Sequence, residues 1–302
     1  MDTNEYRSRL PELGEFLSEY ELVLKNATKF NMLDVAWSAN VLLSIDSGYD
    51  APGVTIDIAK QMIAGGIPFK STKVPAVQSF TVPKDGAKAE MMWNQAFAFI
   101  EQCSIAERSG GARIDDEPLI FCFDISEIAG QIGSQEMHAV LRTLLDIKGR
   151  FIYVFRIPYL EGQDLKKVQS VISDIFPLRT LAVKPLDDEQ LAGYLKGRLE
   201  QIGVIFEGSK IDSTIADMIA YEKSDGRFDG IATMNKLADS IIYLKFARMK
   251  NATKSGKAGA FRVTVSGREL LEIYAEIKGG KDGQDAVLEK LDVPVKEKKI
   301  GF

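Results

Sequence analysis

The segment SGYDAPGVT contains most of the residue types that bind nucleotide phosphates in a strand-loop-helix turn. Gly48 and Gly53 stand at the spacing G-x-x-x-x-G, and Thr55 takes the place of the hydroxyl residue that holds Mg²⁺ in such loops. Val54 replaces the lysine that neutralises the terminal phosphates. Because a hydrogen bond to a charged group contributes about 1.5–3 kcal/mol, this loss predicts binding weakened by about ten- to a hundredfold. Asp50 adds a negative charge that repels phosphate.

A carboxylate at the end of an apolar run is the second feature that suggests phosphate chemistry. The run Leu119–Asp124 resembles a strand whose terminal acid, Asp124, assists Mg²⁺. A glutamate directly after that acid would polarise the attacking water, but Ile125 stands there. Glu127 lies two places further on, where an extended chain turns its side chain to the wrong phase. The metal-binding acid is present and the catalytic glutamate is absent.

Composition excludes several other kinds of site. The 302 residues carry a net charge of −5 and are 45% hydrophobic, which is typical of a globular protein with no polyanion-binding character as a whole. Cys103 and Cys122 imply no disulfide framework, and His138 is the sole histidine, which argues against a histidine metal centre or a Ser-His triad. With no signal peptide and no apolar stretch of membrane-spanning length, we expect a cytoplasmic protein without membrane insertion.

Strands and helices alternate through the first part of the chain and thereby position these residues. Apolar runs predict strands at 40–45, 67–72, 119–124, 151–155 and 179–183, with helices at 55–64, 87–108, 134–147 and 164–175 between them. The stretch 73–88 has two prolines and predicts an irregular segment. This alternation indicates an α/β fold with a five-stranded, doubly wound parallel sheet.

Helical periodicity without strands continues after Pro185, over 187–202, 211–221 and 230–249. A basic loop, a short strand in AFRVTV and a helix at 266–277 follow. We therefore predict five parts, namely an N-terminal helical lead-in (1–34), an α/β nucleotide-binding-type domain (35–184), a smaller helical domain (185–250), the basic loop with its strand and terminal helix (251–278), and a flexible charged tail (279–302).

These features together resemble the AAA+ ATPase family of P-loop NTPases over about residues 35–250, and the resemblance implies an α/β nucleotide domain followed by a helical lid. Several functional positions of the family are altered. Arg156 stands where the family's sensor-1 strand ends, commonly in asparagine, and Ile175 stands where an arginine finger precedes Phe176. Asp229 occupies the place of the sensor-2 arginine. Arg179 and Arg227 lie near these two places, but out of register with them.

The joint loss of these residues predicts a catalytically inactive AAA+-like subunit, a pseudo-ATPase, that acts through protein–protein contacts. The resemblance implies a homo-oligomer, or a hetero-oligomer with an active AAA+ protein. We expect no cofactor; if ATP or ADP binds with Mg²⁺, Thr55 and Asp124 are the metal ligands and Asp124 is the sole catalytic candidate. The candidate nucleotide-binding residues are Gly48, Gly53, Val54, Thr55, Asp124 and Arg156.

Two alternatives remain open at this point. One is a divergent active ATPase in which Arg156 or a neighbouring subunit supplies the lysine's charge. In such an ATPase the segment Phe80–Val82 could form a pore loop, but we expect Phe80 to pack on its own domain. The other is a nucleic-acid-binding module built on residues 260–277 and on the basic cluster, although a solvated loop is favoured. The residues of that cluster are Arg248, Lys250, Lys254, Lys257 and Arg262.

Overall fold

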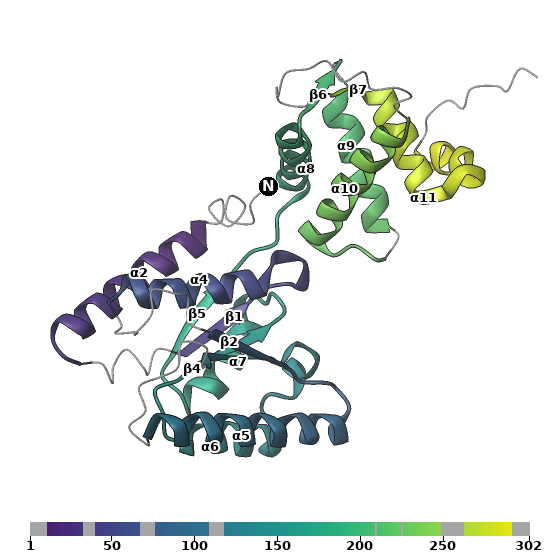
Figure 1. Cartoon of the computed structure of the whole chain (residues 1–302). Coiled ribbons are helices and arrows are strands. Elements are labelled where there is room, and N and C mark those ends of the chain that lie inside the picture. The colour runs from purple at the N-terminus through teal and green to yellow at the C-terminus, as the bar shows by residue number, and fades with distance from the viewer. Residues whose placement is uncertain are drawn as a thin grey trace, which may run out of the picture. The chain divides into compact units, whose positions relative to one another are not determined.

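The computed structural model describes residues 11–32, 40–66, 76–108, 118–208, 210–224, 226–248 and 263–291 (Figure 1). The chain divides between Pro185 and Leu186 into two compact units. The division falls where the strand-helix alternation of the sequence ends. None of the described helices is long and apolar enough to cross a membrane.

A five-stranded parallel sheet forms the centre of the first unit. Its strand order is β2-β3-β4-β1-β5, and each neighbouring pair is parallel. The strands are β1 (Asn40–Ser44), β2 (Ala76–Thr81), β3 (Pro118–Asp124), β4 (Ile152–Ile157) and β5 (Leu178–Ala182). All residues of β1 and β4 are buried, as expected of strands that are covered on both faces. The predicted α/β fold class is confirmed.

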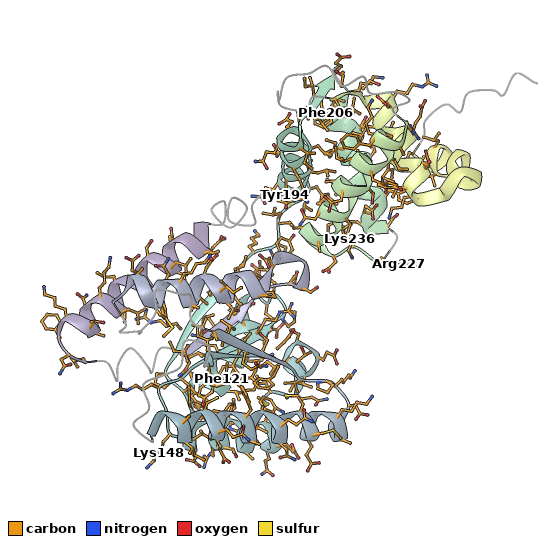
Figure 2. The ribbon with its side chains drawn as sticks, in the orientation of Figure 1. Phe121, Lys148, Tyr194, Phe206, Arg227 and Lys236 are labelled. Carbon is orange, nitrogen blue, oxygen red and sulfur yellow. The ribbon has the colours of Figure 1, made fainter. Side chains whose placement is uncertain are left out.

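Helices cover both faces of this sheet, with α2 and α4 on one side and α5 and α6 on the other (Figure 1). The helices of the first unit are α2 (Pro11–Lys29), α4 (Ala51–Ala64), α5 (Gly86–Arg108), α6 (Gln135–Asp146) and α7 (Gly162–Ser173). Phe121, labelled in Figure 2, belongs to an aromatic core on the side of α5 and α6. There the Phe123 ring lies tilted against Trp93, with ring centroids 4.9 Å apart, and stacks on Phe155 with centroids 6.1 Å apart. The apolar runs of the sequence supply this core.

Strand β2 is the main departure from the sequence-based expectation. The strand expected at 67–72 lies outside the described residues, whereas the stretch 73–88, expected to be irregular, contains β2. The two prolines of that stretch, Pro75 and Pro83, flank the strand and do not interrupt it. Pairing with β3 therefore decides the structure of a segment whose own sequence signal is weak.

The second unit consists of α8 (Asp188–Ile202), α9 (Ile211–Ser224), α10 (Gly230–Arg248), α11 (Gly267–Lys290) and a parallel two-stranded sheet of β6 (Val204–Glu207) and β7 (Val263–Ser266). The expectation that no strand separates its helices is wrong, because β6 follows α8 directly. Gly203, with φ of 107°, ends α8 in a left-handed conformation that favours glycine and turns the chain into β6. The side chains of this unit include the labelled Tyr194 and Phe206 (Figure 2).

Helix α11 extends beyond its predicted end. It continues to Lys290 across a break at Gly280, whose φ of 63° and ψ of −171° are accessible to glycine alone. The expected flexible tail from residue 279 is therefore helical as far as Lys290, and residues 292–302 lie outside the described part. The basic cluster lies outside it as well, apart from Arg248, which forms an ion pair with Glu276 of α11.

Candidate functional site

The loop that follows β1 closes on itself through hydrogen bonds. A 3₁₀ turn at Ser47–Tyr49 leads to Asp50, whose φ of 56° and ψ of 49° are left-handed, and α4 begins at the next residue. The Asp50 carboxylate accepts a hydrogen bond of 3.2 Å from the Gly53 N–H, as a helix N-cap does. Pro52 has no N–H to offer. A carboxylate of the chain therefore occupies the N-terminus of α4, where a phosphate would otherwise bind.

Val54 lies inside α4 and not in an open loop. Its side chain is 0% exposed, and its N–H donates to the Asp50 carbonyl at 3.1 Å. A lysine at this position would have to bring its ammonium group into apolar surroundings or distort the first turn of the helix. Gly53, Val54 and Thr55 are all helical, and the side chain at the position of the missing lysine is buried.

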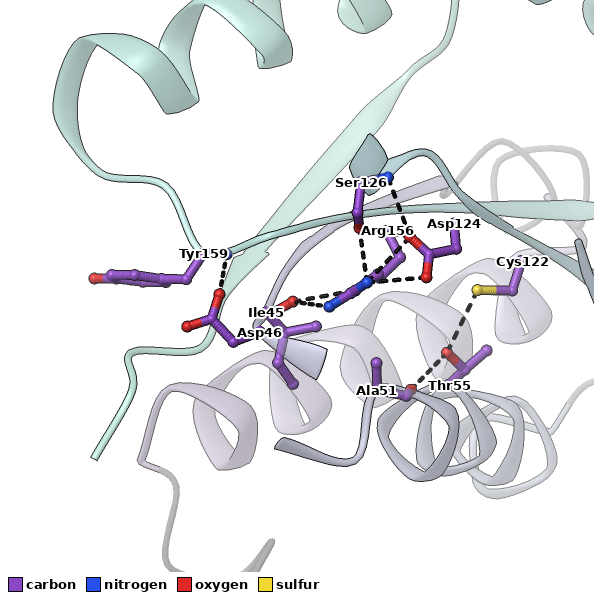
Figure 3. A network of polar contacts seen from close by, with 9 residues as sticks. All are labelled: Ile45, Asp46, Ala51, Thr55, Cys122, Asp124, Ser126, Arg156 and Tyr159. Atoms are coloured by element: carbon purple, nitrogen blue, oxygen red, sulfur yellow. Dashed lines mark hydrogen bonds and ion pairs between the residues drawn. The ribbon is translucent and has the colours of Figure 1, made fainter. Parts of the chain in front are cut away.

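Thr55 uses its hydroxyl within the helix. The group is 1% exposed, and Oγ1 donates to the Ala51 carbonyl at 3.0 Å while lying 3.9 Å from Sγ of Cys122 on β3 (Figure 3). Burial raises the pKa of the Cys122 thiol from 9.0 to about 11, although the contact with Thr55 acts in the opposite direction. In this arrangement, the hydroxyl predicted to hold Mg²⁺ is bonded to the backbone of its own helix.

Asp124 and Arg156 form an ion pair at the carboxyl-terminal edge of the sheet (Figure 3). Their strands pair in register at these two residues, which places the side chains together. Nη1 of Arg156 lies 2.9 Å from Oδ2 and 3.1 Å from Oδ1 of Asp124. Oδ1 also accepts hydrogen bonds from the backbone N–H and the hydroxyl of Ser126. Four contacts therefore occupy most of the acceptor capacity of this carboxylate.

Arg156 is nearly enclosed by protein. Its side chain is 8% exposed; Nε and Nη2 donate to the Ile45 carbonyl at 3.1 and 2.9 Å, and Nη1 also donates to Oγ of Ser126 at 2.7 Å. A metal ion at Asp124 would meet this guanidinium charge at close range. Repulsion costs about 4 kcal/mol per unit of added charge at about 4 Å and an effective dielectric constant of 20. The geometry therefore disfavours a divalent cation on Asp124 while Arg156 stays in place.

Further bonds connect the loops at this edge of the sheet. Asp46 accepts from the Tyr159 N–H at 2.9 Å, and Ser44 Oγ accepts from the Leu160 N–H at 2.9 Å (Figure 3 shows the first). The carboxylate of Glu127, the glutamate nearest to the expected catalytic position, accepts a hydrogen bond from the Lys84 N–H at 2.9 Å. These contacts hold the end of β1 and its loop against the loop after β4, and the loop after β2 against the loop after β3.

The remaining sequence candidates lie elsewhere in the two units. Arg179 pairs with Glu19 of α2, within the first unit. Arg227 is exposed in the second unit, where the N–H of Asp229 donates to Thr233 Oγ1 at 2.8 Å.

The segment Phe80–Val82, considered as a pore loop, has its first two residues in β2. Phe80 stacks on Phe123 with ring centroids 5.3 Å apart, and Val82 is 0% exposed. The packed interpretation of these residues is the one that the structure shows.

Sequence reasoning did not identify Ser126 or the Ile45 carbonyl as parts of the site. The spacing Asp124-x-Ser126 is a signal for the first, because a serine two residues after an aspartate commonly closes a turn onto its carboxylate. The carbonyl of Ile45 carries no signal in the side-chain pattern. Among the described residues, no group of three or more His, Cys, Asp or Glu side chains is placed to hold a metal ion.

The structure has the fold class that the AAA+ resemblance implies, a five-stranded parallel sheet followed by a helical unit. No protein-family model and no curated protein matches the chain. Solved structures match it at low identity. The Aeropyrum pernix ORC1 protein in complex with DNA matches at 15% identity over 80% of this chain and 60% of that one, with a TM-score of 0.42. The chain thus spans less than two thirds of that structure.

Two further structures match over more of their length. PCH-2 of C. elegans matches at 11% identity over 92% of this chain and 68% of that one, with a TM-score of 0.48. RIF2 of Saccharomyces cerevisiae matches at 12% identity over 96% of this chain and 95% of that one, with a TM-score of 0.31.

Proposed function

We propose that the chain is a non-catalytic AAA+-like subunit that acts through protein–protein contacts in an oligomeric assembly. The observation that carries the proposal is the pairing of Asp124 with the buried Arg156, which leaves the carboxylate bonded to protein donors. The capped N-terminus of α4 and the burial of Val54 support the same conclusion, because each removes a phosphate-binding element. A homo-oligomer, or a hetero-oligomer with an active AAA+ protein, is the assembly proposed.

Arg156 also bears on the rival proposal of a divergent ATPase. In that proposal, Arg156 supplies the positive charge of the missing lysine to a bound phosphate. Three of its nitrogens donate to protein acceptors instead, and the side chain is 8% exposed. To reach a phosphate it would have to leave Asp124 and the Ile45 carbonyl, so the geometry favours the non-catalytic subunit.

Titration calorimetry of the full chain with ATP and Mg²⁺ tests this proposal. We expect no saturable binding tighter than about 1 mM, which corresponds to a binding free energy of about −4 kcal/mol. Micromolar binding with turnover, lost in Thr55→Ala and Asp124→Ala, would overturn it. For the assembly, a mass measurement of the purified chain and of cell extract is expected to find oligomers, and monomer alone in both would contradict that part.

A further inference from the structure

Arg156 joins the carboxyl-terminal ends of three adjacent strands. It is part of β4, it bonds Asp124 and Ser126 at the end of β3, and it bonds the Ile45 carbonyl just after β1. In a phosphate-binding loop protein, a nucleotide and its metal ion connect the loops at this edge. Here a side chain of the protein makes the connection.

We propose that Arg156 is an internal cation that takes the structural place of a bound nucleotide and metal ion, so that this edge of the sheet keeps one conformation without a ligand. The inference rests on the proposed function in that it assumes an edge free of nucleotide. Asp124 supplies the balancing charge, and the neutral Ser126 hydroxyl and the neutral Ile45 carbonyl accept further hydrogen bonds from the guanidinium. The device would make the contacts of this subunit with its partners independent of ATP.

The geometry requires a guanidinium group and not merely a positive charge. Nε and Nη2 share one carbonyl, while Nη1 contacts the carboxylate and the Ser126 hydroxyl. These partners belong to two different strand ends, and the planar fork of arginine reaches both at once. A lysine has one nitrogen on a flexible stem and cannot reproduce this set of bonds.

Chemical rescue tests the proposal directly. Arg156→Ala is expected to lower the midpoint of thermal unfolding by about 10 °C, because it leaves a carboxylate without its charged partner. Added guanidinium chloride at about 20 mM should bind where the Arg156 guanidinium lay, between Asp124 and the Ile45 carbonyl. It should restore at least a third of that loss by mass action, relative to the same concentration of NaCl. Arg179→Ala, which removes the exposed pair with Glu19, is the matched control and should show a small loss and no rescue.

A midpoint of Arg156→Ala within about 2 °C of the wild type, or an effect of guanidinium no larger than on Arg179→Ala, would overturn the proposal. Should Arg156→Ala fail to fold, Arg156→Lys decides by hydrogen exchange. Faster exchange at the amides of Ser126 and Tyr159, with the second unit unchanged, supports the internal cation; unchanged exchange at both amides refutes it. Nucleotide binding by the wild type would contradict the proposed function and leave the rescue result standing.

Discussion

Val54 illustrates how one residue changes two properties of a binding loop together. Its side chain is fully buried in the first turns of α4, so lysine at this position lacks both the space and the solvent that the ammonium group needs. A lysine at position 54 alone therefore does not restore a phosphate-binding site. Val54→Lys is expected to lower the free energy of unfolding by about 2–4 kcal/mol and to confer no ATP binding.

Chemical denaturation and calorimetry with ATP and Mg²⁺ check this prediction. Ile56→Lys is the matched control, because Ile56 lies on the same helix and is 40% exposed, so its stability should change by less than about 0.5 kcal/mol. A Val54→Lys protein that is as stable as this control and binds ATP micromolarly would show that the loop is a phosphate site lacking only its charge.

At the residue scale, the types at the site could be predicted from the sequence, but their pairings could not. The sequence predicts separate roles for Asp124 and Arg156, one as a metal ligand and the other as a positive charge for phosphate. Their mutual ion pair depends on the register of β3 against β4, which no local pattern encodes. The cap formed by Asp50 depends likewise on where α4 begins, and helix starts are uncertain by several residues in sequence-based predictions.

At the scale of elements, some strands could be predicted from the sequence and others could not. Fully apolar runs made β1, β3 and β4 predictable, because strands covered on both faces leave little room for polar residues. Strand β2 was missed, since as an edge strand it is only partly buried and its sequence mixes polar and apolar residues. The strand β6 was missed because it is short and follows α8 after a single glycine.

Phe80 provides a test of β2 as a packed strand. It stacks on Phe123 and lies 6.5 Å from the Phe99 ring, so Phe80→Ala is expected to cost about 2–4 kcal/mol of unfolding free energy. Phe30→Ala makes the same chemical change at a side chain that is 66% exposed and should cost less than about 1 kcal/mol. Denaturation curves of the two variants measure this difference. Equal losses of unfolding free energy would argue against packing of Phe80 in the core and would support its interpretation as a loop aromatic.

At the scale of the whole molecule, the acids whose pKa is raised by burial gather in the first unit. Burial raises the pKa of Cys122 to about 11 and also raises the pKa of Tyr20 and Tyr153 above the usual tyrosine range. Each group is neutral when protonated, so folding favours the protonated form. Their contribution to stability is complete below the pKa values of the unfolded chain, near 9 for the thiol and 10 for the phenols, and is lost as the pH rises above them.

Alkaline conditions are therefore expected to destabilise the first unit, and tryptophan fluorescence follows it selectively because Trp37 and Trp93 both precede Pro185. The denaturant concentration at the fluorescence-detected midpoint should decrease as the pH is raised from 8 to about 10.5.

Tyr20→Phe should make this decrease smaller and should raise the free energy of unfolding at neutral pH by about 1 kcal/mol. The reason is that the Tyr20 hydroxyl is buried without a hydrogen-bond partner among the described residues. Tyr153→Phe is the matched control: its hydroxyl donates to the Leu144 carbonyl, so its loss should destabilise the unit at neutral pH. Equal changes in the free energy of unfolding for the two substitutions at neutral pH would mean that the Tyr20 hydroxyl does have a partner. A midpoint that does not change with pH would rule out burial of the thiol and the two phenols as a source of alkaline instability.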